Sequence, residues 1–411
     1  MQKDSKISFI TLWRFNDWGM YNRRDEAILW ELSRRDIVEK VLHIEHIGIK
    51  VLMYRTIQWV KEKDALLREV YKFHVKKGMS LKPISIDNEK KYYVYSVVSL
   101  YQGNNPILKE ISNHFLNIQY FTINKYFSKA GENVVLIAYP PSKYLSNAIE
   151  TIRHDILIAD FEDDTAERFH DEEAAKNRIL HNYQKILPQC NWIFSTSPSI
   201  NQKYKDYAQQ EITFLPNGAD IKNFRANSYK KLFKKVNKKA VGYIGILNRE
   251  IDFDLFEYIL SRYPQVDFVL IGCASDDQLI EINKLAKQYN NLRYLGARNY
   301  RDIPGYLTAF DVLINIKKND HTTAGADLQK IYDYLSSGKP IVTTPIPPAD
   351  RFADLMYVAS DKFQFSEFLK IALEEDNKEL REKRIKIALD NSWDKRVDVI
   401  LERAKALLAD N

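Results

Sequence analysis

Two kinds of apolar pattern alternate along the second half of the chain. Short runs rich in Val, Ile and Tyr lack in/out alternation, as strands buried on both faces require. Amphipathic stretches with helical spacing separate them, for example Phe253–Arg262 and Asp276–Tyr289. The expected strands are Ala240–Ile244, Val266–Ile271, Leu292–Leu295, Val312–Ile316, Pro340–Thr343 and Tyr357–Ala359. Strands and helices that alternate at this spacing predict a parallel, doubly wound sheet.

The first half repeats this pattern around a less regular middle. Helices are expected at Arg24–Arg35 and, within the charged segment 50–131, at Trp59–Val75. The expected strands are Ile7–Leu12, Val38–Ile44, Asn133–Tyr139, Asp155–Asp160, Trp192–Thr196 and Ile212–Leu215. The whole pattern predicts an α/β protein made of two Rossmann-like domains in tandem.

Domain boundaries follow from a polar, Lys-rich stretch between the two halves. We expect a first domain over 1–220, a linker over 221–239, a second domain over 240–391 and a final helix over 392–411. Open α/β sheets bind ligands at the carboxyl ends of their strands. Two such domains facing each other would form a cleft, which favours an enzyme with a nucleotide on one side and an acceptor on the other.

Length and composition narrow the class of protein. A chain of 411 residues fits two domains, and 45% hydrophobic with 28% charged residues is an ordinary globular mixture. Its two cysteines, Cys190 and Cys273, cannot form a disulfide framework, which favours a reducing cytoplasm. The longest apolar run, Tyr92–Tyr101, is far shorter than the roughly 20 residues that span a bilayer. No secretory signal is expected at the start either.

The net charge of +6 is concentrated in the first third of the chain. Residues 1–130 hold 22 Lys/Arg and 14 Asp/Glu, a surplus of 8, and residues 50–93 mix 11 Lys/Arg with many aromatic residues. Such a segment suits an anionic membrane surface, a phosphate-bearing substrate or nucleic acid. No nucleic-acid motif accompanies it, so we favour a peripheral membrane face. On that face, Lys76, Lys77, Lys90 and Lys91 are expected to contact the anionic surface. The alternative is a solvated surface, with the aromatic residues in the core and the lysines in water.

Five segments together resemble the GT-B glycosyltransferases, especially bacterial enzymes of cell-surface polysaccharide assembly. The segment 214–220 (FLPNGAD), followed by Phe224, is similar to the "PNGVD…F" element that closes the first domain in that superfamily. The segment 329–342 (QKIYDYLSSGKPIV) is similar to its "KxxEYxxxGKPVV" element. Residues 24–29 (RDEAIL) and 159–164 (ADFEDD) resemble two elements of the subgroup with the teichuronic-acid transferases, and 392–397 (SWDKRV) resembles the last helix, which crosses back onto the first domain.

This resemblance implies a sugar transfer from a nucleoside-diphosphate donor, bound by the second domain, to a glycan acceptor on the first, possibly polyprenyl-linked. Two positions depart from the family. Its second Glu is Asp333 here, and the position of its first Glu is Gly325. The departure agrees better with a subgroup that uses a basic residue, for which Lys330 is the candidate.

The expected donor residues lie at the start of a helix and at turns that follow strands. Lys330 and Asp333 are three apart on one helical face, where a cation near a helix N-terminus suits a diphosphate and a carboxylate suits ribose hydroxyls. A surface ion pair is the alternative. The further candidates are Gly245, Arg249, Arg298, Tyr300, His321 and Gln329.

Four carboxylates within five residues, Asp160 to Asp164, end one expected strand of the first domain. They could supply a general base for an acceptor hydroxyl, a helix N-cap or a metal site. We take Asp163 as the first choice for the base and Asp164 as the second. Acceptor contacts are expected from Trp18, Arg24 and His46, and no metal or other cofactor is expected because fixed cations can neutralise the leaving diphosphate.

Two other functions remain open for the same fold. One is a non-catalytic, transferase-like subunit that binds carbohydrate, against which the retained acids and Lys330 argue. The other is a sugar-nucleotide epimerase, which would not explain the basic, aromatic first third. The absent first Glu and the candidate base favour inversion over retention of configuration.

Overall fold

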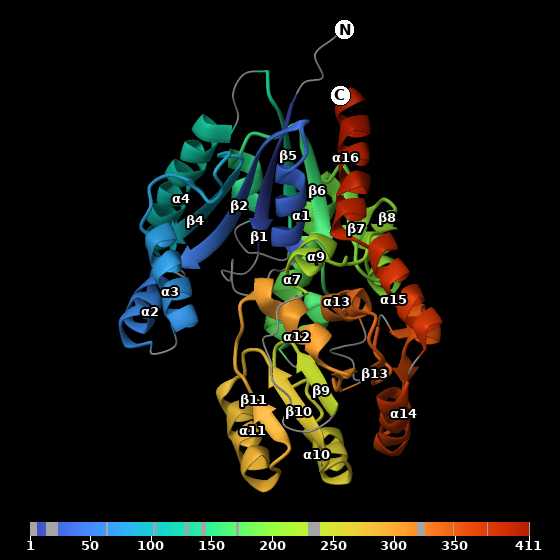
Figure 1. The fold of residues 1–411 in the computed structure, drawn as a ribbon. Helices are drawn as coiled ribbons and strands as arrows, with labels where there is room; N and C mark the ends of the chain where they lie inside the picture. The colour runs from blue at the N-terminus through green and yellow to red at the C-terminus, as the bar shows by residue number, and fades with distance from the viewer. Residues whose placement is uncertain are drawn as a thin grey trace. The chain divides into compact units, whose positions relative to one another are not determined.

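The computed structural model describes residues 6–13, 24–62, 65–101, 103, 105–127, 131–140, 145–169, 172–228, 239–318, 325–347, 349–375 and 377–410. The chain divides into two compact units. The first comprises Met1–Leu215 with Arg396–Asn411, and the second comprises Pro216–Lys395. Each unit is a sheet with helices packed against it (Figure 1).

The first unit contains an eight-stranded sheet with the order β3-β4-β2-β1-β5-β6-β7-β8. Its strands are β1 (Ile7–Trp13), β2 (Val38–Gly48), β3 (Ile84–Ser85), β4 (Tyr92–Ser99), β5 (Asn133–Ala138), β6 (Ile156–Phe161), β7 (Trp192–Ser195) and β8 (Ile212–Phe214). All neighbouring strands are parallel except β3 and β4. All six strands expected in this half are present. β4, which the sequence analysis considered only as too short to span a membrane, is buried beside β2.

Helices cover both faces of this sheet (Figure 1). They are α1 (Arg24–Ser33), α2 (Ile49–Lys61), α3 (Ala65–Gly78), α4 (Pro106–Phe127), α5 (Leu145–Thr151), α6 (Thr165–Arg168), α7 (Glu173–Ile186), η1 (Leu187–Gln189) and α8 (Pro198–Ala208). The single helix expected over Trp59–Val75 is wrong, because α2 starts directly after β2 and ends at Lys61 before α3 begins. The two helices pack against each other.

The second unit contains a six-stranded parallel sheet with the order β11-β10-β9-β12-β13-β14. Its strands are β9 (Lys239–Ile244), β10 (Val266–Ile271), β11 (Leu292–Tyr294), β12 (Val312–Asn315), β13 (Ile341–Thr343) and β14 (Tyr357–Val358). Its helices are α9 (Ile221–Asn227), α10 (Phe253–Arg262), α11 (Asp276–Gln288), η2 (Tyr300–Asp302), α12 (Ile303–Ala309), α13 (Gln329–Ser337), η3 (Ala349–Leu355), α14 (Lys362–Glu374), α15 (Lys378–Asp390) and α16 (Trp393–Ala409). Each of the six strands falls within one residue of its expected bounds, because a strand buried on both faces has an apolar run as long as itself.

The two ends of the second unit differ from a simple linker and tail. The stretch expected as a linker starts with α9, which Asp220 caps and whose Phe224 packs in the apolar core of this unit. The last helix, α16, starts in the second unit, while its residues from Arg396 onward belong to the first. There Asp398 pairs with Arg35 at 2.9 Å.

A cluster of charged side chains, Asp25, His43, Glu45 and Lys77, is buried in the first unit beneath α1 and α3. Glu45 of β2 pairs with Lys77 of α3, and both side chains are fully buried. On the same strand, His43 Nδ1 lies 2.7 Å from Asp25 of α1, and its Nε2 lies 3.8 Å from Glu45. Lys77, which was expected among the cations that contact an anionic membrane, is instead internal and anchors α3 to the sheet.

The charge states of the side chains in this cluster depend on one another. Burial alone would lower the pKa of His43, but the carboxylates of Asp25 and Glu45 raise it to about 9, so His43 is cationic at neutral pH. Burial opposes ionisation of Glu45, yet Lys77 and His43 hold its pKa well below the usual range. Because the folded-state pKa of His43 exceeds its unfolded value, this stabilisation is complete below about pH 6.5 and is lost as the pH rises through about 9.

Lys77→Met should lower the free energy of unfolding by about 3–5 kcal/mol, because it leaves the Glu45 carboxylate buried without its cation. Urea denaturation measures this loss. Lys76→Met, at the exposed neighbouring position, is the matched control and should change stability by less than about 0.5 kcal/mol. Adding Glu45→Gln to Lys77→Met should recover part of the lost stability. Equal losses of stability in Lys77→Met and Lys76→Met would contradict the buried pair of Lys77 and Glu45.

Candidate functional site

In the second unit, the start of α13 lies against the carboxyl end of β9. The hydroxyl of Tyr334 donates to the Ile244 carbonyl and accepts from the Ile244 N–H, at 3.2 and 2.8 Å. One turn earlier, Lys330 donates from Nζ to the Tyr243 hydroxyl at 2.6 Å and lies 4.0 Å from the centre of that ring. The structure therefore brings two of the expected donor residues, Lys330 and Gly245, together.

Gly245 gives the ammonium of Lys330 room at the end of β9. Its φ of +148° is one that side chains rarely adopt, and a Cβ there would lie 2.6 Å from Nζ of Lys330. Gly272, at the end of the neighbouring strand β10, approaches so closely that a Cβ would lie 1.9 Å from the Gly245 carbonyl oxygen. Backbone rather than side chains thus forms this edge of the sheet, so a ligand can approach the main chain closely.

The ammonium of Lys330 is electrostatically unsatisfied. Burial, together with the nearby Lys317 ammonium, lowers the pKa of Lys330 well below its usual value. Lys317 itself is paired with Glu250. Within the described part of the chain, no carboxylate lies at ion-pair distance from Lys330, so an anion bound there would stabilise its charged form.

Asp333 follows one turn later on α13 and lies in a different, acidic environment. It lines a small pocket with Asp220, Phe224 and Tyr300, and the Tyr300 hydroxyl lies 3.5 Å from both of its carboxylate oxygens. Burial, together with the charge of Asp220, raises the pKa of Asp333 to about 8. The carboxyl is thus buried beside a like charge, which is unfavourable in the folded protein without a ligand.

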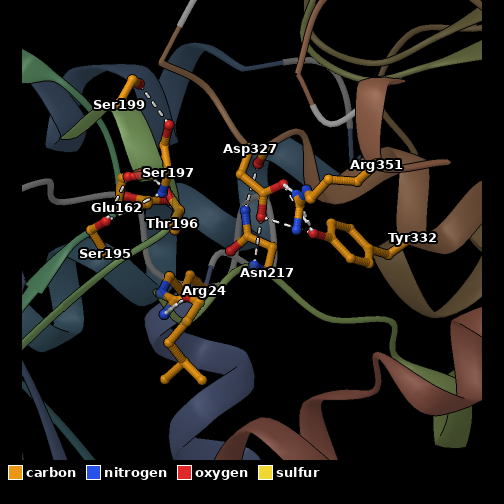
Figure 2. A network of polar contacts seen from close by, with 11 residues as sticks. Arg24, Glu162, Ser195, Thr196, Ser197, Ser199, Asn217, Asp327, Tyr332 and Arg351 are labelled. Carbon is orange, nitrogen blue, oxygen red and sulfur yellow. Dashed lines mark hydrogen bonds and ion pairs between the residues drawn. The ribbon is translucent and has the colours of Figure 1, made fainter. Parts of the chain in front are cut away.

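Asp327, two residues before α13, organises the same end of the unit and was not identified from the sequence. It accepts from the Asn217 N–H at 2.6 Å and from the Tyr332 hydroxyl at 3.0 Å, and it is ion-paired with Arg351 (Figure 2). The Asn217 amide in turn donates to the Asp327 carbonyl at 2.6 Å. This network fixes Asn217 of the PNG segment to the residues just before α13. The only signal of Asp327 in the sequence was an acid two residues after Gly325.

The other expected donor residues are less closely tied to this site. Arg298 donates from Nε to the Tyr306 hydroxyl at 3.1 Å and from Nη1 to the Ala297 carbonyl at 2.8 Å, which holds it along its own turn. Arg249 is exposed after β9, and Gln329 is partly buried at the first position of α13. His321 lies outside the described residues.

In the first unit, the acidic cluster after β6 splits into separate roles. Asp160 is buried and pairs with Arg24 at 2.7 Å. Asp164 is the N-cap of α6, where it accepts from the Glu167 N–H at 3.1 Å and binds Lys203 and the Tyr204 hydroxyl. Asp164 thus occupies the helix N-cap that the sequence analysis left open as an alternative for this cluster.

Asp163 and Glu162 remain partly buried at the end of β6. The Glu162 carbonyl accepts from Thr196 Oγ1 at 2.5 Å, which joins the ends of β6 and β7 (Figure 2). Among the described residues, no group of three or more His, Cys, Asp or Glu side chains is arranged to hold a metal ion. The role of Asp163 as the base stays a prediction.

Two of the expected acceptor residues are internal, and the third cannot be placed. Arg24 is 1% exposed, and besides Asp160 it binds the Leu215 carbonyl at 2.8 Å, so it links the ends of β6 and β8 (Figure 2). His46 contacts the Tyr120 hydroxyl of α4 at 2.5 Å, and burial lowers its pKa to about 3, which keeps it neutral. Both thus have structural partners within the first unit, while Trp18 lies outside the described residues.

Solved structures of other proteins match this chain over nearly its full length. HepE from Anabaena, solved with UDP, is 15% identical with a TM-score of 0.64, covering 98% of this chain and 100% of HepE. Sucrose-phosphate synthase from Thermosynechococcus elongatus is 12% identical with a TM-score of 0.70, covering 99% and 100%. Both are GT-B glycosyltransferases. The fold is GT-B.

The sequence comparisons are weaker but agree with this fold. No family model matches the chain. TuaH of Bacillus subtilis, named as a candidate teichuronic acid biosynthesis glycosyltransferase, is 21% identical over 183 residues. That match covers 44% of this chain and 45% of TuaH, so it spans less than half of the relative. The resemblance to GT-B glycosyltransferases of the teichuronic-acid type is confirmed by these findings together.

Asp333→Asn should stabilise the protein by about 1–2 kcal/mol at pH 8 and have little effect at pH 5, because it removes a buried charge beside Asp220. The folded-state pKa of Asp333, about 8, lies above its unfolded value, so the native carboxyl loses stability as the pH rises from about 4 towards 8. Urea unfolding across this pH range measures the difference. Asp354→Asn, at an exposed acid of the same unit, should show no such pH dependence.

Proposed function

We propose that this GT-B protein is a glycosyltransferase that moves a sugar from a UDP-sugar donor to a glycan acceptor in bacterial surface-polysaccharide synthesis. The second unit binds the donor, and the first unit binds the acceptor. The solved neighbours support the donor class, since HepE was solved with UDP and with UDP-glucose, and an E. coli protein with a TM-score of 0.67 was solved with UDP-2-fluoro glucose. The name of TuaH supports the acceptor class.

One observation carries the donor assignment: Lys330 lies at the start of α13, against Gly245, without a carboxylate partner among the described residues. A helix N-terminus, a glycine edge and a buried cation together favour a dianionic diphosphate. One turn further along α13, Asp333 offers a carboxylate to the ribose hydroxyls. The unfavourable charges of both residues in the free protein become favourable when these groups arrive.

The transfer itself needs a base and a stabilised leaving group. Asp163 takes the proton from the acceptor hydroxyl as its oxygen forms a bond to the anomeric carbon of the sugar. The bond from that carbon to the diphosphate breaks, and UDP leaves with the electron pair, its charge stabilised by Lys330. Direct attack of this kind inverts the configuration, and fixed cations replace a metal ion.

Lys330→Met should weaken UDP binding by about 10–150-fold, because the diphosphate loses a charge-assisted contact of about 1.5–3 kcal/mol. Isothermal titration calorimetry with UDP measures the change, and Lys370→Met, at an exposed position of α14, serves as the control. In wild-type protein, UDP at 100 times its Kd should add about 2.7 kcal/mol to the free energy of unfolding. No binding of UDP to the wild type would refute the donor assignment.

Asp163→Asn should slow sugar transfer by about 10²–10⁴-fold and leave UDP affinity intact, because the amide keeps the shape but not the basicity of the carboxylate. The assay follows labelled sugar from a panel of UDP-sugars into lipid-extractable product, and the rate should persist in EDTA. Asp164→Asn is the matched control, since Asn caps helices as well as Asp does. A comparable loss in both variants would assign the cluster to folding instead of proton transfer.

A further inference from the structure

The helices α2 and α4 of the first unit carry an apolar surface that faces solvent. On α2, the only buried side chains are Leu52 and Arg55, whereas five large apolar residues point outward. These are Val51, Met53, Tyr54, Ile57 and Val60, with exposed fractions of 36, 61, 56, 49 and 72%. A helix of a soluble domain ordinarily turns its apolar face inward, so α2 is oriented the opposite way.

Polar contacts hold α2 in this orientation. Arg55 of α2 is buried against α3, where its Nη1 lies 2.7 Å from Nδ1 of His74. Burial lowers the pKa of His74 to about 3, so the imidazole is neutral and can accept a hydrogen bond from the guanidinium. The inward face of α2 thus combines Arg55 with the apolar Leu52, while its outward face carries the exposed apolar residues.

α4 carries a second exposed apolar face in the same unit. Four apolar side chains, Ile107, Ile111, Ile118 and Phe121, follow one stripe of this helix and are each more than half exposed. Both helices also reach one small buried cluster, where Phe115 of α4 and Ile49 and Leu52 of α2 pack with Ile47 and Val98. Figure 1 shows α2, α3 and α4 gathered beside β4 and β2 at one side of the first unit.

Basic side chains accompany this surface. Among the described residues between 50 and 126, exposed cations outnumber exposed acids by nine to three. The cations are Lys50, Lys61, Arg68, Lys72, Lys76, Lys82, Lys90, Lys109 and Lys125, and the acids are Glu69, Glu89 and Glu110. Lys50 and Lys61 stand near the two ends of α2, and Lys109 lies in the first turn of α4. Exposed apolar side chains with a surplus of lysine are the combination that binds the interface of an anionic bilayer.

We propose that the apolar faces of α2 and α4 form a docking surface for an anionic membrane, with Met53, Ile57 and Val60 entering the headgroup region. No helix in the described part of the chain is long and apolar enough to cross the bilayer, so this contact is one of attachment. The inference rests on the proposed function for its purpose, which is to bring the enzyme to a lipid-linked acceptor. The surface itself is testable without activity.

The test is co-sedimentation of the full chain with phosphatidylcholine vesicles, with and without phosphatidylglycerol. We expect binding to the anionic vesicles that weakens with salt. The triple variant Met53→Ser, Ile57→Ser, Val60→Ser should reduce binding at least about tenfold, because it removes the apolar groups that insert. Its matched control is Ile280→Ser, Phe363→Ser, Ile371→Ser, which changes equally exposed residues of the second unit and should bind as wild type does.

A second pair of variants tests the charges. Lys50→Gln, Lys61→Gln, Lys109→Gln should weaken binding to anionic vesicles by about 100-fold, since each cation near such a surface contributes about fivefold. The control Lys287→Gln, Lys370→Gln, Lys386→Gln removes three exposed cations of the second unit and should have a much smaller effect. The changes lie on exposed positions, so all four variants should unfold within about 1 kcal/mol of wild type.

Two outcomes would overturn the proposal. One is vesicle binding that is absent, or that falls equally in the α2 variant and its control. The other is a dimer in light scattering that the α2 variant dissociates without any vesicle binding, which would assign the surface to a second copy of this chain. UDP affinity, measured on the same preparations, separates the two hypotheses: a wild type that binds vesicles through α2 but not UDP would refute the donor assignment and leave the docking surface standing.

Discussion

The cost of removing charge from water governs both units of this protein. A buried ion is tolerated when an opposite charge and hydrogen bonds replace its hydration. In the first unit, Arg24 pairs with Asp160 across the ends of β6 and β8, and Lys77 pairs with Glu45 between α3 and β2. Such pairs add little net stability over an apolar core, but they allow few alternative arrangements. They fix which residues lie at the carboxyl ends of the strands, where an α/β sheet binds its ligands.

The second unit follows this rule at Asp327 and departs from it at two positions of α13. Asp327 is satisfied by Arg351, Tyr332 and Asn217, so the start of α13 is held rigidly. Lys330 instead lies near another ammonium, and Asp333 lies near another carboxylate. A folded protein that satisfies its other buried charges has no structural reason to keep two mismatched ones on a single helix. A bound donor would resolve this mismatch, because its diphosphate would supply negative charge to Lys330 and its ribose hydroxyls would donate to Asp333. Such preorganised charges destabilise the free protein and stabilise the complex.

The sequence predicted the sheets well and the partners of polar residues poorly, for one physical reason. A strand buried on both faces is mostly apolar, so the run Val266–Ile271 marks β10 residue for residue, although it includes the buried Asp267, which pairs with Arg293. A charged residue gives no such signal, because Lys76 in water and Lys77 in the core are neighbours with the same side chain. The acids after β6 showed the same limit: sequence alone offered base and cap as alternatives, and only the contacts of Asp164 with Glu167 and Tyr204 separated it from Asp163. Arg24 and His46 were expected to contact the acceptor, and their structural partners gave no signal in the sequence because Asp160 and Tyr120 lie 136 and 74 residues away.

The α2–α3 region was the least predictable part of the fold, because the partners of its polar residues cannot be read from the sequence. It also carries the exposed apolar face of α2. One helix was expected over Trp59–Val75, whereas the structure has the two helices α2 and α3. Two polar contacts help to hold them: Glu45 binds α3 through Lys77, and His74 of α3 binds α2 through Arg55. Leu52 of α2 is buried, while Met53, Ile57 and Val60 remain outside. The buried charges of the first unit therefore have two effects. They position the ends of the strands, and they hold α2 so that its exposed apolar face is available to the proposed membrane surface.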